Sequence, residues 1–243
     1  MSHSCLGEWF ESPRGRYLLA WEHARFDERV ADIFGFNAAQ IGLCGHDFLR
    51  ANRMALRLRC TDRRDTALLT ADLLAEAEEL PFASQSLDLV VLPHVLEFVS
   101  HPHQVLREVE RVLLPEGHVL ITGFNPVSLW GLRRSLAGHM GVLPWTGQYL
   151  GVPRLKDWLS LLGFEHRGVT SGCFAPPVAS EEWLRRWSFM EVAGAHCWPF
   201  GGAVYMLHAV RRLPGMRLML MPAWREQRAR RKAMVPAAHR HGR

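Results

Sequence analysis

The sequence predicts an α/β fold built around a mostly parallel β-sheet with helices on both faces, and three adjacent segments indicate it. Residues 87–92 (LDLVVL) form a near-continuous apolar run, which is typical of a strand buried on both faces. Residues 101–117 (HPHQVLREVERVLLPEG) place apolar side chains at helical spacing, and we expect this helix to end at Pro115 and Gly117. Residues 118–124 (HVLITGF) form a second apolar strand. A strand, a helix and a strand in succession form a crossover, which makes the two strands parallel.

The residues before this unit predict one long helix and three short strands. Residues 12–35 are expected to form an amphipathic helix with Ser12 as its N-cap, Pro13 at its first position and Gly35 at its end. Its apolar stripe consists of Leu18, Leu19, Trp21, Phe26, Val30 and Ile33. Residues 37–45 (NAAQIGLCG) predict a strand that runs into a glycine turn. Residues 54–60 and 72–76 are expected to be the second and third strands.

The residues after this unit complete the domain. Residues 154–170 (RLKDWLSLLGFEHRGVT) predict a helix, a glycine and a strand, and residues 202–212 (GAVYMLHAVRR) predict the last strand. We therefore divide the chain into an N-terminal helical segment (1–36), an α/β domain (37–210) with an insert at 126–153, and a basic tail (211–243) that is expected to be flexible.

Composition limits the class of protein. The chain has 243 residues, which fits one α/β domain with appendages. It has no apolar run of about 18 residues and no apolar segment near its start, so we expect neither a membrane span nor a signal peptide. No two cysteines form a C-x-x-C pair, which favours a reducing cytoplasm. The five cysteines are Cys5, Cys44, Cys60, Cys173 and Cys197.

The net charge of +5 is unevenly distributed. Residues 211–243 hold ten basic residues and one acid, a charge of +9, so residues 1–210, with 19 basic and 23 acidic residues, carry −4. The tail is therefore the part of the chain that suits contact with nucleic acid or another anionic surface.

The predicted ligand site lies at one edge of the sheet. Ligands of open α/β sheets bind beyond the carboxyl ends of the strands. The segments expected there are GLCGHD, AEAEELPF, LPHVLEF and GFNPVSLWG, which follow four different strands.

Residues 75–126 (AEAEELPFASQSLDLVVLPHVLEFVSHPHQVLREVERVLLPEGHVLITGFNP) resemble class I S-adenosylmethionine (SAM)-dependent methyltransferases of the type 11 group. The shared pattern is an acid five residues before the proline of LPF, the following apolar strand, and the LLPEG turn before the next strand. GFNPVSLWGLRR is similar to a small proteobacterial subgroup. The resemblance implies a Rossmann-like sheet of seven strands with an antiparallel last strand, and SAM as the cofactor.

The resemblance also implies cofactor-binding residues. Glu76 stands where the family's acid contacts the adenine, and Ala77 would present its backbone amide to the same ring. In the family's glycine loop, Gln40 occupies the position of the acid, Gly42 that of the first glycine and Cys44 that of the second. A carboxylate at Gln40 is therefore expected to tighten cofactor binding.

Asp62 and His94 have two interpretations each. Asp62 follows the second predicted strand and is either the ribose-binding acid or a loop residue. His94 follows the strand at 87–92; it either lines the cofactor site, where it is the candidate general base, or is a wall residue with satisfied hydrogen bonds. Asp88 and Glu97 are expected to be structural and on the helix surface, respectively.

Other side chains support no separate site. The histidines and Cys197 fit no metal spacing, so no metal is expected. Core packing is favoured over substrate stacking for the aromatic residues near the start of the chain, Trp9, Phe10, Tyr17 and Trp21. The family keeps substrate lids at the place where this chain has its insert. Either role fits the insert's aromatic residues, Trp130, Trp145 and Tyr149.

The sequence thus predicts a methyltransferase that acts on a small organic acceptor. Two alternatives stay open: an RNA or protein methyltransferase guided by the basic tail, and a non-catalytic SAM-binding protein with a degenerate cofactor loop.

Overall fold

The computed structural model describes residues 4–62, 70–137, 144–178, 180–187 and 189–212. The predicted tail lies outside these residues from 213 onward. The described residues belong to one compact unit, and none of their helices is long and apolar enough to cross a membrane.

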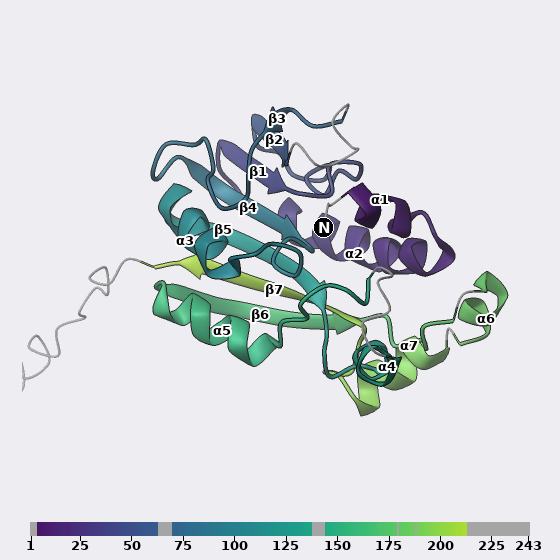
Figure 1. Cartoon of the computed structure of the whole chain (residues 1–243). Coiled ribbons are helices and arrows are strands. Elements are labelled where there is room, and N and C mark those ends of the chain that lie inside the picture. The colour runs from purple at the N-terminus through teal and green to yellow at the C-terminus, as the bar shows by residue number, and fades with distance from the viewer. Residues whose placement is uncertain (1–3, 63–69, 138–143, 179, 188, 213–243) are drawn as a thin grey trace, which may run out of the picture. The chain divides into compact units, whose positions relative to one another are not determined.

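Seven strands form a single sheet in the order β3-β2-β1-β4-β5-β7-β6 (Figure 1). They are β1 (Asn37–Ile41), β2 (Leu56–Thr61), β3 (Leu73–Leu74), β4 (Leu87–Pro93), β5 (Leu113–Phe124), β6 (Phe164–Gly172) and β7 (Val204–Arg211). β1 to β5 pair in parallel, and β7 runs antiparallel to both β5 and β6. The predicted fold class, a mostly parallel seven-stranded sheet with an antiparallel last strand, is confirmed.

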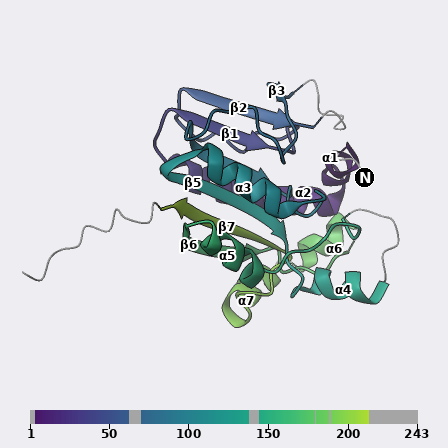
Figure 2. The ribbon, with the colours of Figure 1, turned by 60° about the vertical axis from the view of Figure 1, so that its left-hand side comes forward.

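Helices cover both faces of this sheet, as the turned view shows (Figure 2). They are α1 (Ser4–Phe10), α2 (Pro13–Ala31), α3 (Pro102–Val112), α4 (Leu129–Ala137), α5 (Val152–Leu161), α6 (Glu181–Arg186) and α7 (Phe189–Cys197). Alternate residues of β4 face opposite layers: Leu89 and Val91 pack in the core with α1 and α2, whereas Val90 and Leu92 pack with α3 and α5. The apolar run of β4 is thus explained by burial on both sides.

The start of α2 is confirmed and its end was predicted too late. The Ser12 hydroxyl accepts a hydrogen bond from the Gly15 amide at 3.1 Å, as an N-cap does. The helix ends at Ala31, four residues before Gly35. Gly35 instead lies against Asp88, where a Cβ would come within 2.4 Å of the Asp88 side chain.

The Asp88 carboxylate accepts hydrogen bonds from the amides of Phe36 and Asn37, at 2.8 and 3.0 Å. It therefore fixes the entry into β1, which confirms its structural role.

The end of α3 was also predicted too late. The helix ends at Val112, and β5 begins at the next residue, before Pro115 and Gly117. Leu113 already pairs with Leu87 of β4, and the register shifts before the regular pairing resumes at His118. Pairing with β4 therefore ends the helix earlier than the proline and glycine would.

The end of β7 ties the strand to the rest of the domain. The Arg211 guanidinium donates to the Leu113 carbonyl and pairs with Glu110, and Arg212 pairs with Glu165 at 2.7 Å. The first two residues of the predicted tail are thus part of the folded domain.

Candidate cofactor site

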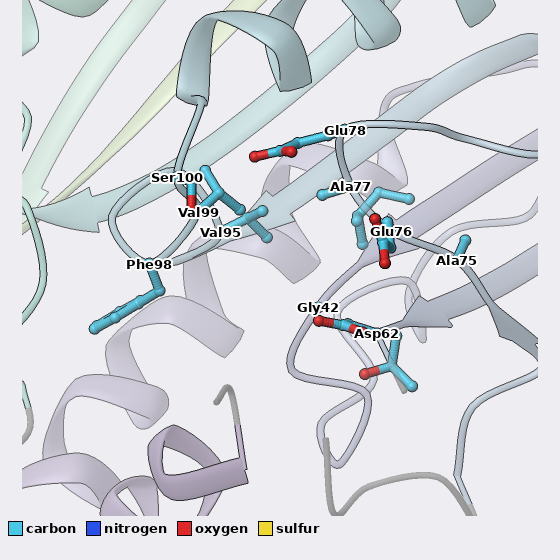
Figure 3. A pocket seen from close by; sticks show the side chains of 12 residues that line it. Gly42, Asp62, Ala75, Glu76, Ala77, Glu78, Val95, Phe98, Val99 and Ser100 are labelled. Atoms are coloured by element: carbon cyan, nitrogen blue, oxygen red, sulfur yellow. The ribbon is translucent and has the colours of Figure 1, made fainter. Parts of the chain in front are cut away.

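A cavity lies at the carboxyl ends of β1, β2, β3 and β4 (Figure 3). Each strand contributes the residues that follow it, so segments far apart in the sequence meet there. The lining residues are Ile41, Gly42, Thr61, Asp62, Ala75, Glu76, Ala77, Glu78, Val95, Phe98, Val99 and Ser100. This is the edge of an α/β sheet at which ligands bind.

Three residues with carboxylates line this cavity: Asp62, Glu76 and Glu78. The last two differ in their contacts. Glu78 accepts a hydrogen bond from the His101 amide at 3.0 Å, which ties the loop after β3 to the start of α3. Glu76 begins a tight turn in which the Glu79 amide donates to its carbonyl at 3.1 Å. Within the described part of the chain, the Glu76 carboxylate itself has no hydrogen-bond partner. It is therefore available to accept from a ligand.

Gly42 allows the loop after β1 to pass close to the end of β4. Its φ is +81°, in the left-handed region that favours glycine. A Cβ at this position would lie 2.9 Å from the Val95 side chain. Leu43 follows with a φ of 46°, so the backbone stays left-handed for two residues. The family's first glycine thus occupies a position where the structure needs a glycine.

Gln40 points into the loop and away from the cavity. Its side-chain amide donates to the carbonyls of Gly42, Leu43 and His46, at 3.1, 3.2 and 2.8 Å. Its side-chain oxygen accepts from the Phe48 amide at 2.9 Å. Gln40 therefore holds the loop closed, and a carboxylate would lack the three donated hydrogen bonds. The expectation that a carboxylate here tightens cofactor binding does not follow from this geometry.

The structure brings together four of the seven predicted site residues. Gly42, Asp62, Glu76 and Ala77 line the cavity. Gln40, Cys44 and His94 are fully buried and do not line it.

His94 lies between two buried carboxylates. Its Nε2 atom is 2.8 Å from Glu22 Oε1 on α2, and its Nδ1 atom is 2.8 Å from Glu97 Oε2. Burial lowers the pKa of His94, but the two carboxylates outweigh burial and raise its pKa to about 10. His94 is therefore a buried imidazolium at neutral pH, and both of its nitrogens are engaged. In this arrangement the ring cannot accept a proton from a substrate, which leaves the candidate general base without support.

The contacts of His94 hold the turn that forms one wall of the cavity. Its φ is +52°, and its amide donates to the Thr122 carbonyl at 3.2 Å. Glu97 also accepts from the Phe124 amide. Val95 and Phe98, next to these two residues in the chain, line the cavity. The charged cluster of Glu22, His94 and Glu97 thus positions this wall.

Sequence reasoning missed both carboxylates of this cluster. Glu97 was expected on a helix surface but is buried. Glu22 lies four residues after Leu18 and four before Phe26, on the apolar stripe of α2. An acid at such a position was the signal that a buried partner exists.

The aromatic residues of the insert belong to the core. Trp130, Trp145 and Tyr149 are buried, and the Trp130 indole donates to the Ala175 carbonyl at 2.9 Å. The rings of Tyr149 and Phe124 stack with centroids 5.2 Å apart. Of the two roles left open, packing is the one that their contacts support.

Comparison with known proteins gives consistent matches. Residues 42–121 match the type 11 family model, described as a methyltransferase domain. The Escherichia coli protein YafS is 31% identical over 158 residues, which is 65% of this chain and 64% of that protein. The malonyl-[acyl-carrier protein] O-methyltransferase of Laribacter hongkongensis is 36% identical over 108 residues, which is 44% of this chain and 35% of that protein. This chain thus spans less than two thirds of the length of either relative.

A solved SAM-dependent methyltransferase from Archaeoglobus fulgidus has the same fold. It matches with a TM-score of 0.58 and 17% identity, over 81% of this chain and 94% of that chain. The sheet order, the glycine loop after β1 and the family match agree with one another. The chain thus has the fold of class I methyltransferases, and its residues 42–121 match the methyltransferase-domain family, whose cofactor is S-adenosylmethionine.

Proposed function

We propose that this protein is an active SAM-dependent methyltransferase that transfers a methyl group to a small organic acceptor. The observation that carries the proposal is the cavity at the carboxyl ends of β1 to β4, where Gly42, Asp62, Glu76 and Ala77 meet. The catalytic domain would span residues 37–210.

The lining residues fit the chemical groups of SAM. The Glu76 carboxylate, which has no hydrogen-bond partner within the described ranges, could accept a hydrogen bond from the adenine amino group, and the Ala77 amide would lie at the same ring. Asp62 would bind the ribose hydroxyls. Gly42 leaves a backbone that a cofactor can approach closely, because no Cβ is present.

The chain's own task in such a reaction is to bind SAM and the acceptor, to orient them and to exclude water. SAM supplies an activated methyl group on a sulfonium, so little acid–base chemistry is required of the protein. The Glu22, His94 and Glu97 cluster would act by fixing the wall formed by Val95 and Phe98. His94 is therefore proposed as a positioning residue.

Isothermal titration calorimetry with SAM and with its demethylated product tests the cofactor assignment. We expect Glu76→Ala to bind SAM about ten- to a hundredfold more weakly, because one hydrogen bond to a charged group contributes about 1.5–3 kcal/mol. Glu182→Ala removes an exposed carboxylate on α6 and is expected to leave the affinity unchanged. If the folded wild-type protein bound no SAM at millimolar concentration, the proposal would be wrong.

A non-catalytic SAM-binding protein is the second candidate. Two observations favour it: Gln40 replaces the acid of the family's loop, and His94 has no free nitrogen. The two candidates differ in product formation. An active enzyme releases demethylated cofactor when it is supplied with SAM and an acceptor library, whereas a binding protein takes up SAM and releases none. The third possibility, an RNA or protein acceptor, predicts turnover that is lost when residues 214–243 are deleted.

A further inference from the structure

Helix α7 has an unusual surface for a helix that faces water. Most of its residues are apolar (FMEVAGAHC), yet none of them is buried. Phe189 is 60% exposed and Val192 is 79% exposed, and Phe200 in the following turn is 73% exposed. Surface helices normally present polar residues to water, and a continuous exposed apolar patch indicates an interaction site.

The one carboxylate in this region is directed inward. Glu191 is the only aspartate, glutamate, lysine or arginine between positions 187 and 200, and His196 is the only histidine. Its side chain accepts hydrogen bonds from the Phe174 amide, at 2.9 Å, and from the Tyr17 hydroxyl. α7 is thus fastened to the domain through its polar side chain, and its apolar side chains are left outward. It lies beside β6, an edge strand of the sheet (Figure 1).

Tryptophans lie before and after α7. Trp183 on α6 is 51% exposed, and the Arg186 guanidinium lies 5.5 Å from its ring centroid. Trp198 follows α7 and is 46% exposed. Tryptophan and arginine are the residue types that gather at the boundary between lipid and water, because each combines an apolar body with a polar end.

We propose that the second half of α6, α7 and the turn after α7 (residues 183–187 and 189–200, the α7 surface) dock on an anionic lipid bilayer. α7 has nine residues, whereas a span needs about 20, so α7 would lie within the interface between lipid and water. This proposal does not depend on methyl transfer.

The charge of the chain favours a bilayer over a second protein as the partner. Residues 213–243 contain eight arginine and lysine residues and one acid. Each basic residue near an anionic membrane adds to the attraction between the chain and the lipid surface. Stable attachment to a membrane usually needs two signals, such as an apolar contact and a polybasic segment. The α7 surface supplies the first signal and the sequence after β7 supplies the second.

The chain offers a matched control for the apolar contact. Outside the α7 surface, the side chains of Phe34, Phe36 and Leu161 are 76–80% exposed and serve as the control set. Each set contains two phenylalanines and one aliphatic residue. The test variant carries Phe189→Ser, Val192→Ser and Phe200→Ser, and the control variant carries Phe34→Ser, Phe36→Ser and Leu161→Ser. All six side chains are exposed, so both variants are expected to fold, which circular dichroism would verify.

Vesicle flotation with the full-length protein decides the proposal. The vesicles contain phosphatidylcholine alone or phosphatidylcholine with about one third phosphatidylglycerol. We expect the wild-type protein and the control variant to float with the anionic vesicles. The test variant should partition at least about tenfold more weakly, because it loses the burial of three apolar side chains.

Three outcomes would overturn the proposal. One is an absence of binding by the wild-type protein to anionic vesicles. Another is equal binding by the test variant and the wild-type protein, which would assign attachment to the basic tail alone. The third is that the wild-type protein binds no vesicles but forms a dimer in light scattering, and that the test variant does not form this dimer. That result would make the α7 surface an interface between two copies of the chain.

Discussion

Replacing His94 by glutamine should destabilise the protein strongly. The change removes the cation between Glu22 and Glu97, whose carboxylate oxygens each lie 2.8 Å from a ring nitrogen. Two buried carboxylates would then face each other without a counter-charge, which typically costs about 3–5 kcal/mol. The pKa of His94 gives a similar upper limit: a rise from 6.5 to about 10 corresponds to about 5 kcal/mol. Total stabilities of domains are about 5–15 kcal/mol, so the loss would be easily measured.

The same contact predicts how stability depends on pH. The pKa of His94 is higher in the folded than in the unfolded protein, so the folded state holds the proton more tightly. The stabilisation is therefore complete below the ordinary pKa of histidine and is lost as the pH rises toward about 10. Urea unfolding at about pH 6, 8 and 9.5 should show this loss in the wild-type protein and a smaller loss in His94→Gln.

Two further variants complete the test. Adding Glu22→Gln to His94→Gln removes one of the unpaired carboxylates, so the double variant should be less destabilised than the sum of the two single changes. His196→Gln changes an exposed histidine and should alter stability by less than about 0.5 kcal/mol. A loss below about 1 kcal/mol for His94→Gln, with the pH dependence of the wild-type protein, would refute the buried ion cluster.

Three more predictions concern the loop after β1 and the chain end. Gln40→Glu removes the donor to three carbonyls and buries a charge, so it should destabilise the protein by about 2–4 kcal/mol. Burial raises the pKa of the introduced carboxyl, so the loss of stability should be smaller at acidic than at neutral pH. Equal stability of the variant and the wild-type protein in urea unfolding at both pH values would contradict this prediction. Gly42→Ala should cost about 1–3 kcal/mol through its positive φ and the nearby Val95, and should weaken SAM binding; unchanged affinity in calorimetry would contradict the close approach. Deleting residues 214–243 should leave the melting temperature nearly unchanged, because the ion pairs of Arg211 and Arg212 remain. The deletion should also abolish RNA binding at low salt. A large drop in melting temperature would show that the deleted segment is part of the fold.

The fold was predictable because the buried faces of a strand or a helix show in the spacing of apolar residues within that element. β4 reads as a continuous apolar run because both of its faces are covered, and α3 shows its buried side every three to four residues. The ends of the helices were less predictable. Asp88, 52 residues from Phe36 in the chain, decides where the backbone turns into β1. Such a contact leaves no trace near the helix end itself.

The site was predictable only in part, for the same reason. The position of Gly42 follows from its place after a strand and from the resemblance to a family. The direction of the Gln40 side chain does not, because it depends on how the loop from Gly42 to Phe48 folds back over it. The partners of His94 lie 72 residues before it and three residues after it, so only the position of Glu22 on an apolar stripe hinted at the cluster.

The strand order has a consequence for the path by which the chain folds. Among the described residues, β7 is the last strand in the sequence, but it lies between β5 and β6 in the sheet. Until residues 204–211 have been synthesised and inserted, β5 lacks one neighbour and β6 has none. Unpaired strand edges invite pairing with other chains, so nascent or truncated chains that stop before Val204 should aggregate. The long loop closures that this insertion requires should also make folding slow, with β7 joining late.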